Sequence, residues 1–281
     1  MDWGSALPRS DGSLPTSVNE PARDVSGRSG PRGSKMFAAN LPTPSADDFW
    51  SALRELRPNQ SRLEDNRLIP TAQADAAHVP IDMLRTRVAA MMEEKGWKTL
   101  AVTSPTAGCG KTTIAVNLAF SMARRRQGRV VLIDLDFRRP RVGTLLEFSP
   151  KSQLEDLFEG KARLADCFSR IGNNLAVAVN TQPVGRAAEL LHSETTKKAL
   201  AEIQRDLQPD MIICDLPPML VNDDFLAFQP SIDCSLLVAG AEYSTIGEID
   251  VCERELGQHE TLLGVVLNKC RYSPARYGYG Y

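Results

Sequence analysis

From Thr99 onward, short apolar runs alternate with stretches of helical periodicity, and this alternation limits the possible fold more than any other feature of the sequence. The predicted strands span residues 99–104, 129–135, 175–179, 210–215, 233–239 and 262–267. The predicted helices span residues 110–126, 152–158, 186–207 in two pieces, 222–228 and 245–257. Strands that alternate with helices form βαβ units around a parallel sheet. Because most runs are apolar throughout, helices should cover both faces, and the predicted fold is α/β with a doubly wound, mostly parallel sheet.

The chain divides into four segments by composition. Residues 1–45 are rich in Pro, Ser and Gly and poor in large apolar side chains, so we expect them to be disordered. Residues 46–77 are expected to hold a short helix and a linker, and residues 78–270 to form one nucleotide-binding domain. Residues 271–281 form a tyrosine-rich tail.

The short helix has a clear start signal. Ser45 and Asp48 form a capping-box pattern, and Trp50 lies among apolar residues at helical spacing. This helix either docks on its own domain, lies idle in a linker, or docks on a partner. Residues 59–77 are interpreted as linker, and a second helix is expected to begin at Pro80.

Charge and cysteine content exclude several classes of protein. The formal net charge is −2, which gives no cationic field for nucleic acid, so no nucleic-acid partner is expected. The six cysteines include no C-x-x-C pair, which argues against a zinc site or a disulfide framework. No apolar run is long enough to span a bilayer. We therefore expect a cytoplasmic protein that reaches a membrane only through a partner or a surface helix.

The loop after the first predicted strand has the pattern of a phosphate-binding loop. Gly108, Cys109, Gly110, Lys111, Thr112 and Thr113 lie between that strand and an apolar helix, which is the order that a P-loop requires. Glycines let the backbone approach phosphate oxygens, and the positive end of the helix faces them. The pattern departs from the usual one at Pro105, where a glycine is typical. An accidental turn before a helix is the alternative.

Three aspartates follow predicted strands. Asp134 and Asp136 end one apolar run, and Asp215 ends another. Ligands of open α/β sheets bind outside the carboxyl ends of the strands, so these side chains should gather around the phosphate loop. Two carboxylates about 4 Å apart repel by about 4 kcal/mol at an effective dielectric constant near 20, which a bound cation would relieve. Mg²⁺ on nucleotide phosphates would supply that cation.

These residues resemble a known family. The phosphate loop, the run Ile133–Arg138 and the run Asp215–Pro218 resemble the Walker A, Walker A′ and Walker B motifs of the bacterial protein-tyrosine kinases of capsule and exopolysaccharide biosynthesis. That family is related to the MinD and ParA ATPases. The Arg138-Arg139-Pro140 sequence is particularly similar to the kinases, and Glu189-Leu190-Leu191 is similar to another of their segments. The resemblance implies a P-loop NTPase fold with deviant Walker motifs, and ATP with Mg²⁺ as cofactors.

The resemblance also implies roles for single residues. The catalytic residues would be Lys111, Asp134 and Asp136. The nucleotide-binding residues would be Gly108, Cys109, Gly110, Lys111, Thr112, Thr113 and Asn268, the last of which would contact adenine. The metal ligands would be Thr112, Asp134 and Asp215.

The tail adds a further implied function. Tyr272, Tyr277, Tyr279 and Tyr281 resemble the family's autophosphorylation cluster, although a flexible aromatic tail is the plain alternative. The implied partners are a membrane-embedded polysaccharide co-polymerase that activates the kinase, other copies of the chain in a homo-oligomer, and tyrosine-containing protein substrates.

A second function stays open, that of a MinD- or ParA-like ATPase switch or a weakly active regulator without protein kinase activity. The kinases use Glu-x-x-Arg-x-x-Arg at a ring interface, where this chain has Val79, Asp82 and Arg85. Leu216 also replaces the hydroxyl residue that is common after the Walker B aspartate. The tyrosine tail and Arg138-Arg139-Pro140 favour the kinase.

Overall fold

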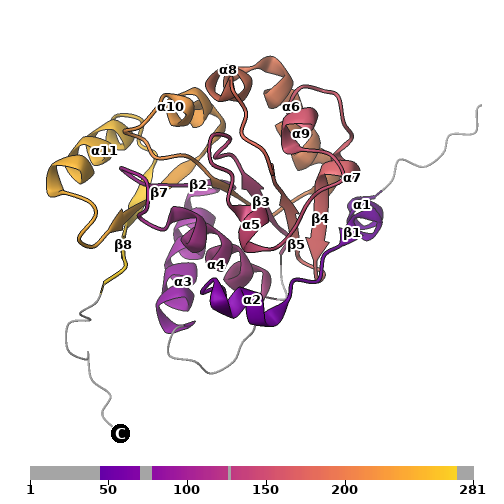
Figure 1. The fold of residues 1–281 in the computed structure, drawn as a ribbon, viewed down its shortest axis with the longest axis horizontal. Helices are drawn as coiled ribbons and strands as arrows, with labels where there is room; N and C mark the ends of the chain where they lie inside the picture. Colours follow the sequence, from indigo (N-terminus) through magenta and orange to yellow (C-terminus); the bar gives the residue numbers. More distant parts are fainter. Residues whose placement is uncertain (1–44, 70–77, 126–127, 271–281) are drawn as a thin grey trace, which may run out of the picture. The chain divides into compact units, whose positions relative to one another are not determined.

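The computed structural model describes residues 45–69, 78–125 and 128–270. These residues form one eight-stranded sheet with the strand order β1-β4-β5-β3-β6-β2-β7-β8 (Figure 1). Every neighbouring pair is parallel except β4 and β5, which are antiparallel. The predicted doubly wound, mostly parallel sheet is confirmed.

The strands are β1 (Arg54–Glu55), β2 (Thr99–Thr103), β3 (Val130–Asp134), β4 (Phe168–Ile171), β5 (Leu175–Ala178), β6 (Met211–Asp215), β7 (Cys234–Gly240) and β8 (Leu262–Asn268). All six predicted strands are present, each with boundaries within one residue of those expected. The sequence pattern did not predict β1 and β4, which lie together at one end of the strand order.

The helices are α1 (Ala46–Ala52), α2 (Gln60–Asp65), α3 (His78–Lys95), α4 (Lys111–Ala123), α5 (Val142–Leu145), α6 (Leu154–Phe158), α7 (Leu164–Cys167), α8 (Ala187–His192), α9 (Glu194–Leu207), α10 (Asp224–Phe228) and α11 (Ile246–Gln258), with a 3-10 turn η1 at Gln229–Ser231. The break expected within 186–207 is confirmed. It falls at Ser193, whose side chain accepts a hydrogen bond from Thr196 N and so begins α9.

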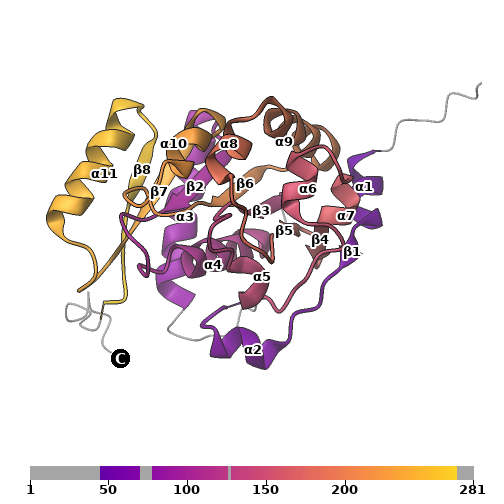
Figure 2. The same cartoon turned by 45° about the horizontal axis from the view of Figure 1, so that its top comes forward.

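Helices cover both faces of the sheet. Along β3, Val131 and Ile133 pack into one apolar core, while Val130 and Leu132 pack into the other. The first core includes α6, α9 and α11, and the second includes α3 and α4. Figures 1 and 2 show α3 and α4 on one side of the sheet and α9 on the other. The continuous apolar runs of the strands are thus explained by burial on both faces.

Helix α1 docks on its own domain. The Ser45–Asp48 capping box is formed, and Trp50 is buried against α9, where its Nε1 donates to the carbonyl of Leu207 over 2.7 Å. The guanidinium of Arg129 lies 5.3 Å from the centre of the Trp50 ring. Of the three interpretations of this helix, docking on its own domain is the one that the structure supports.

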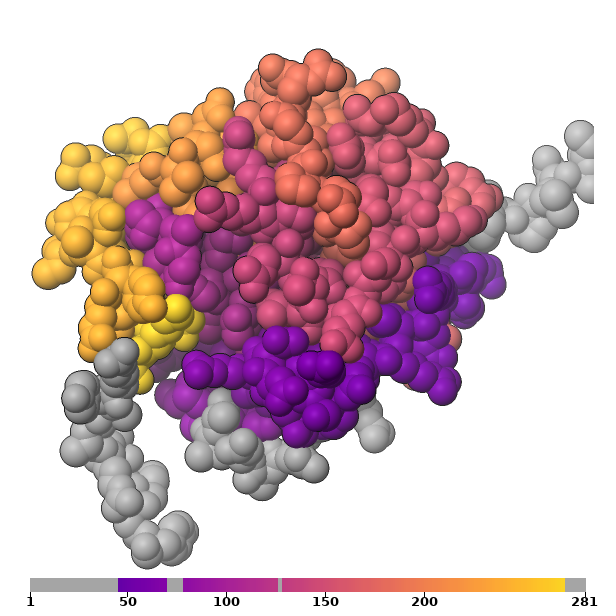
Figure 3. All heavy atoms as spheres, in the orientation of Figure 1, coloured from indigo at the N-terminus to yellow at the C-terminus, as the bar shows by residue number. Residues whose placement is uncertain are grey.

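The interpretation of residues 59–77 as linker is wrong for their first part. Residues 60–65 form α2, and Asn59 caps its start because the Asn59 side chain accepts hydrogen bonds from Ser61 N and Arg62 N. Leu63 and Leu68 are buried, so this segment packs on the core. In the space-filling view the indigo segment containing α1, β1 and α2 lies against the magenta part of the domain (Figure 3). The second helix begins at His78, two residues before the expected Pro80.

Some expectations concern residues outside the described ranges. They include the disorder of residues 1–44 and the four tail tyrosines, Tyr272, Tyr277, Tyr279 and Tyr281. Within the described ranges, none of the helices has the length and apolar character to cross a bilayer.

Candidate nucleotide-binding site

The loop between β2 and α4 is held in a shape that depends on glycine. Gly108 and Gly110 have φ angles of +87° and +93°, a region that side chains other than glycine rarely adopt. A Cβ on Gly110 would also lie 2.3 Å from Nδ2 of Asn268. Helix α4 begins directly after the loop, at Lys111, so its first backbone N–H groups face the carboxyl edge of the sheet.

Lys111 and two of the predicted aspartates meet at this edge. The Nζ atom of Lys111 lies 2.8 Å from Oδ2 of Asp136 and 3.2 Å from Oδ1 of Asp215. Strands β3 and β2 are the two neighbours of β6, which explains why residues after all three strands converge. Burial alone would lower the pKa of Lys111, but the charges of Asp215 and Asp136 outweigh burial and raise it. The side chain therefore stays an ammonium.

The third predicted aspartate, Asp134, lies beside Asp136 and Asp215 and is fully buried. It stands opposite Asp215 in the register of β3 and β6. Its Oδ2 accepts hydrogen bonds from Arg141 N and Val142 N over 3.0 and 2.9 Å, and its Oδ1 accepts one from Asp136 N over 3.3 Å. Burial, followed by the charge of Asp215, raises the pKa of Asp134 well above its usual range. Asp134 thus fixes the backbone of the loop that carries Asp136.

Asp215 has spare capacity for a ligand. Burial raises the pKa of its carboxyl, and the ammonium of Lys111 offsets this only in part. Its Oδ2 is buried and has no hydrogen-bond partner among the residues that the structure describes. The hydroxyl of Thr112 lies 3.4 Å from Nζ of Lys111, the same ammonium that contacts Asp215. The carboxylates of Asp136 and Asp215 carry more negative charge than the single ammonium of Lys111 neutralises, so electrostatics favour binding of a further cation here.

The donor set fits magnesium that arrives with a nucleotide. Within the described residues, no group of three or more His, Cys, Asp or Glu side chains is arranged to hold a metal alone. Magnesium usually takes one or two protein oxygens and completes its shell with phosphate oxygens and water. The hydroxyl of Thr112 and the unpaired oxygen of Asp215 match that pattern.

The end of β8 holds the phosphate loop in place. Asn268 Nδ2 donates to the carbonyl of Cys109 over 2.9 Å. The Cys109 thiol is buried and lies 3.3 Å from Ser244 Oγ, which also accepts a hydrogen bond from Gly240 N. Asn268 was expected to contact adenine, whereas here its amide donates to the loop. The adenine contact stays a prediction.

Two residues beside the phosphate loop, Tyr243 and Lys269, were not predicted from the sequence as part of the site. Tyr243 lies next to Gly108, and Lys269 Nζ sits 4.1 Å from the centre of its ring. Tyr243 belongs to no motif, and Lys269 was considered only as the end of the segment that holds Asn268. Both residues follow strands, β7 and β8, that end beside the loop only in the folded protein.

The aligned ring positions have contacts inside the chain. Asp82 binds Arg85 over 3.0 Å, Arg124 over 2.6 Å and the hydroxyl of Ser121 over 2.7 Å. The hydroxyl of Ser121, ahead of the nearby cationic groups, lowers the pKa of Asp82 despite some burial. Arg124 also donates to the carbonyl of Ile69. Arg124 thus joins α4 to α3 and to the segment after α2.

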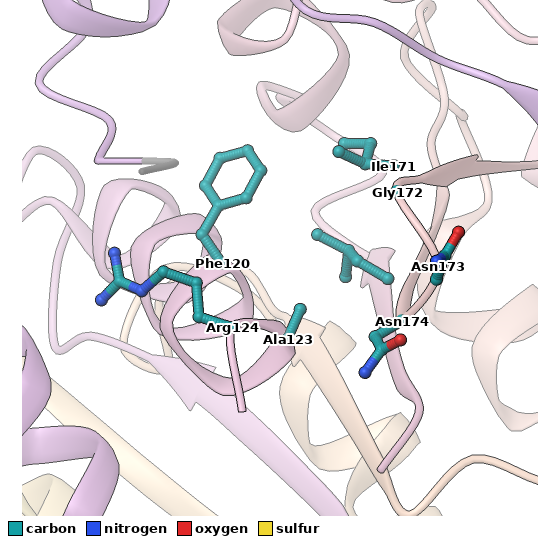
Figure 4. A pocket seen from close by; sticks show the side chains of 8 residues that line it. Phe120, Ala123, Arg124, Ile171, Gly172, Asn173 and Asn174 are labelled. Carbon is teal, nitrogen blue, oxygen red and sulfur yellow. The ribbon is translucent and has the colours of Figure 1, made fainter. Parts of the chain in front are cut away.

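A large hollow lies away from this chemistry. It encloses about 640 Å³ and is lined by Phe120, Arg124, Ile171 and Asn174, among others (Figure 4). These residues lie at the end of α4, at the end of β4 and just before β5, at the opposite edge from the phosphate loop. Its size alone does not make it the site of nucleotide chemistry.

The fold and this site define a class of protein. Residues 100–276 match the family described as the CobQ/CobB/MinD/ParA nucleotide binding domain. That match covers more than half of the chain, and it agrees with the P-loop geometry. The protein is a nucleotide-binding protein of this class.

Comparison with individual proteins narrows the class. The chain is 31% identical over 185 residues to tyrosine-protein kinase CpsD of Streptococcus pneumoniae serotype 4, covering 80% of that protein. It is 30% identical over 197 residues to tyrosine-protein kinase Etk of Escherichia coli K12, covering 69% of this chain and 27% of Etk. The solved kinase domain of E. coli tyrosine kinase ETK superposes with a TM-score of 0.66 at 25% identity, covering 86% of this chain and all of that domain.

The chain belongs to the family of bacterial tyrosine-protein kinases. Several of the longer relatives extend well beyond it, and the chain spans about a quarter of their length.

Proposed function

We propose that this chain is an ATP-dependent, autophosphorylating protein-tyrosine kinase that regulates capsule or exopolysaccharide biosynthesis and export. The observation that carries the proposal is the convergence of Lys111, Asp136 and Asp215 beside a glycine-shaped phosphate loop. Phosphoryl transfer depends mainly on positioning and on neutralising charge, and this set of groups is suited to both. The relatives named as tyrosine-protein kinases support the same chemistry.

Each residue has a proposed task. Lys111 and the backbone N–H groups from Gly108 to Thr113 hold the phosphates of ATP. Thr112 and Asp215 hold magnesium, whose charge would neutralise the phosphate oxygens. Asp136 orients or deprotonates the incoming tyrosine hydroxyl, because it is the aspartate that contacts Lys111 and retains slight exposure.

Asp134 has a different proposed task. Its oxygens accept three backbone N–H groups, so its main role is to hold the loop of Asp136. A role as direct metal ligand or base, as the family resemblance implies, would fall to its Oδ1, which accepts only one of these bonds. The proposed adenine contact of Asn268 likewise accompanies its bond to Cys109.

The proposed substrates and partners extend beyond the domain. Tyr272, Tyr277, Tyr279 and Tyr281 are the proposed autophosphorylation sites, and each phosphate would add nearly two negative charges to the tail. We propose that the chain works in the cytoplasm as a homo-oligomer, recruited to the inner face of the plasma membrane by a co-polymerase that activates it. Other tyrosine-containing proteins would be further substrates.

One observation favours a second candidate, an ATPase switch without protein kinase activity. Asp82 stands where the kinases have a ring arginine, and it binds Arg85 and Arg124 within the chain. These contacts compete with the usual contacts between subunits, and a protein that could not assemble the ring would lose phosphorylation between subunits.

The discriminating experiment uses the purified chain with labelled ATP and Mg²⁺, with and without the cytoplasmic segment of a co-polymerase from the same cell. A kinase will label tail tyrosines, and the label will vanish both in Lys111→Met and when the four tyrosines are changed to Phe. Release of phosphate without phosphotyrosine, even with the activating segment present, would favour the ATPase switch.

A further inference from the structure

Arg138 follows Asp136 by two residues, and its side chain binds a carboxylate far along the chain. The Nε of Arg138 donates to Oδ2 of Asp224 over 2.7 Å, and its Nη2 donates to Oδ1 over 2.8 Å. Two parallel bonds of this kind fix both the distance and the orientation of the partners. The Asp224 side chain is fully buried, whereas that of Arg138 is 43% exposed.

Asp224 is the first residue of α10, and this helix packs on the apolar core. Phe225 and Phe228 of this helix lie in the apolar core. Each oxygen of the Asp224 carboxylate accepts a hydrogen bond from the Arg138 guanidinium. A buried carboxylate of this kind is costly unless it keeps its cation, so the pair holds Arg138 in one place.

The segment between Asp215 and Asp224 is tied to the phosphate loop. The backbone N–H of Met219 donates to the carbonyl of Ser104 over 2.9 Å, and that of Leu220 donates to the carbonyl of Pro105 over 3.1 Å. The loop after β6 is therefore hydrogen-bonded to the start of the phosphate loop. Arg138 connects this assembly to the loop after β3.

Two bridges therefore connect the segments that follow β3 and β6, one through Lys111 and one beside it. On the inside, Lys111 bridges Asp136 and Asp215. On the outside, Arg138 and Asp224 bridge the two segments that follow those same aspartates. When Lys111 moves to the phosphates, it leaves both carboxylates and the inner bridge opens. The outer bridge between Arg138 and Asp224 then still holds the two loops together.

We infer that Arg138 and Asp224 are a positioning pair that maintains the distance between the Asp136 and Asp215 carboxylates when Lys111 turns to the nucleotide. The inference rests on the proposed function, in which both aspartates serve phosphoryl transfer. Neither Arg138 nor Asp224 contacts the reacting atoms in this role. Their effect acts through Asp136.

The test variant is Asp224→Asn, which keeps the shape of the side chain but removes its charge. Its matched control is Asp206→Asn, because Asp206 is also a mostly buried carboxylate with two bonds to an arginine, Arg205, but lies in α9. In full-length protein, Asp224→Asn is expected to lower kcat for tyrosine phosphorylation about 10- to 100-fold, with the KM for ATP nearly unchanged. Asp206→Asn should leave both constants at the wild-type values.

Arg138→Lys provides the second variant. It keeps a cation beside Asp224 and so protects the fold, but it cannot form two parallel bonds. It should therefore melt close to the wild-type temperature and show a kcat between those of wild type and Asp224→Asn. If kcat in both variants matches that of Asp206→Asn, the inference is wrong. It is also wrong if kcat falls only in proportion to the fraction of protein that is unfolded at the assay temperature, because the pair is then merely structural.

A crystal structure of nucleotide-bound Asp224→Asn separates this inference from the proposed function. The inference predicts that the distance between the Asp136 and Asp215 carboxylates changes relative to nucleotide-bound wild type. An unchanged distance overturns the inference even if the kinase is active. Absence of phosphotyrosine in the wild type overturns the proposed function, while the comparison of distances still decides the inference.

Discussion

The ammonium of Lys111 lies between the carboxylates of Asp136 and Asp215, 2.8 Å from one and 3.2 Å from the other. The lysine thus occupies the place where positive charge is needed before a nucleotide arrives. When ATP binds, the same ammonium is expected to turn toward the phosphates. The carboxylates then need another cation, which explains why nucleotide and magnesium should bind together.

Replacing Lys111 with Met should weaken the binding of ATP with Mg²⁺ by about 10- to 100-fold, which corresponds to losing a charged hydrogen bond of about 1.5 to 3 kcal/mol. Titration calorimetry on the purified chain measures this. Lys95→Met, at the exposed end of α3, is the control and should bind ATP as the wild type does. Equal affinities for Lys111→Met and Lys95→Met would contradict the placement of Lys111 at the phosphates.

The pKa of Asp134 predicts a dependence of stability on pH. Burial and the charge of Asp215 raise this pKa in the folded protein. Between the unfolded and the folded pKa, the folded state therefore holds a proton that the unfolded state has released. The contribution of Asp134 to stability is therefore complete below the unfolded pKa and is lost as the pH rises through the folded pKa. Asp134→Asn lacks this titration.

Urea unfolding of the nucleotide-free protein at a series of pH values tests this. The free energy of unfolding of Asp134→Asn minus that of the wild type should increase as the pH is raised from acid toward neutral. Asp166→Asn is the control, because hydrogen bonds from Lys151 and Arg163 lower the pKa of Asp166 and so reverse the sign. A difference for Asp134→Asn that is constant with pH would show that this carboxyl is not protonated in the folded state.

Local sequence pattern was sufficient to predict six strands because each is a short apolar run. Five of them are buried on both faces, and β8, at the edge of the sheet, is partly exposed. Their apolar runs need no knowledge of partners. Strand β1 is two exposed residues, Arg54 and Glu55, and β4 contains Ser169 and Arg170, so neither has an apolar run. They are strands because they pair with each other and with β5, and such pairing is a property of the tertiary structure.

The candidate site divides in the same way. Lys111, Asp134, Asp136 and Asp215 could be predicted to converge because each follows a strand of the same sheet. Ser244 and Asp224 could not, because neither belongs to a motif nor ends a predicted strand, and their contacts with Cys109 and Arg138 are formed only in the folded protein. A motif predicts the groups that meet the ligand, whereas the groups that hold those residues in place become visible only in the fold.

The docking of α1 gives a prediction of stability. Trp50→Phe removes the hydrogen bond to the carbonyl of Leu207 but keeps an aromatic ring, and it should lower the free energy of unfolding by about 1 to 2 kcal/mol. Urea unfolding measures the change. Trp97→Phe is the control, since the indole nitrogen of Trp97 makes no hydrogen bond within the described ranges, and it should cost less. A larger loss in Trp97→Phe would contradict the anchoring role of Trp50.

The contact between Gly110 and Asn268 gives a prediction of coupling. Gly110→Ala should abolish measurable ATP binding, because the new methyl group would lie 2.3 Å from the Asn268 amide at a φ of +93°. Asn268→Ala removes the bond to Cys109 and should weaken ATP binding by about 1 kcal/mol, or roughly fivefold. In the double variant the clash is gone, so binding should return in part despite the strained backbone. The two substitutions are thus expected to be less harmful together than the sum of their separate effects.

Gly160→Ala is the control for backbone strain in this experiment. Gly160 has a φ of +73°, but a Cβ there would meet nothing within 4 Å among the described atoms. Its cost should therefore be limited to about 1 kcal/mol of folding stability, with ATP affinity unchanged. If Gly110→Ala binds ATP like Gly160→Ala, the amide of Asn268 moves aside freely. The phosphate loop would then be shaped by its own glycines, without help from β8.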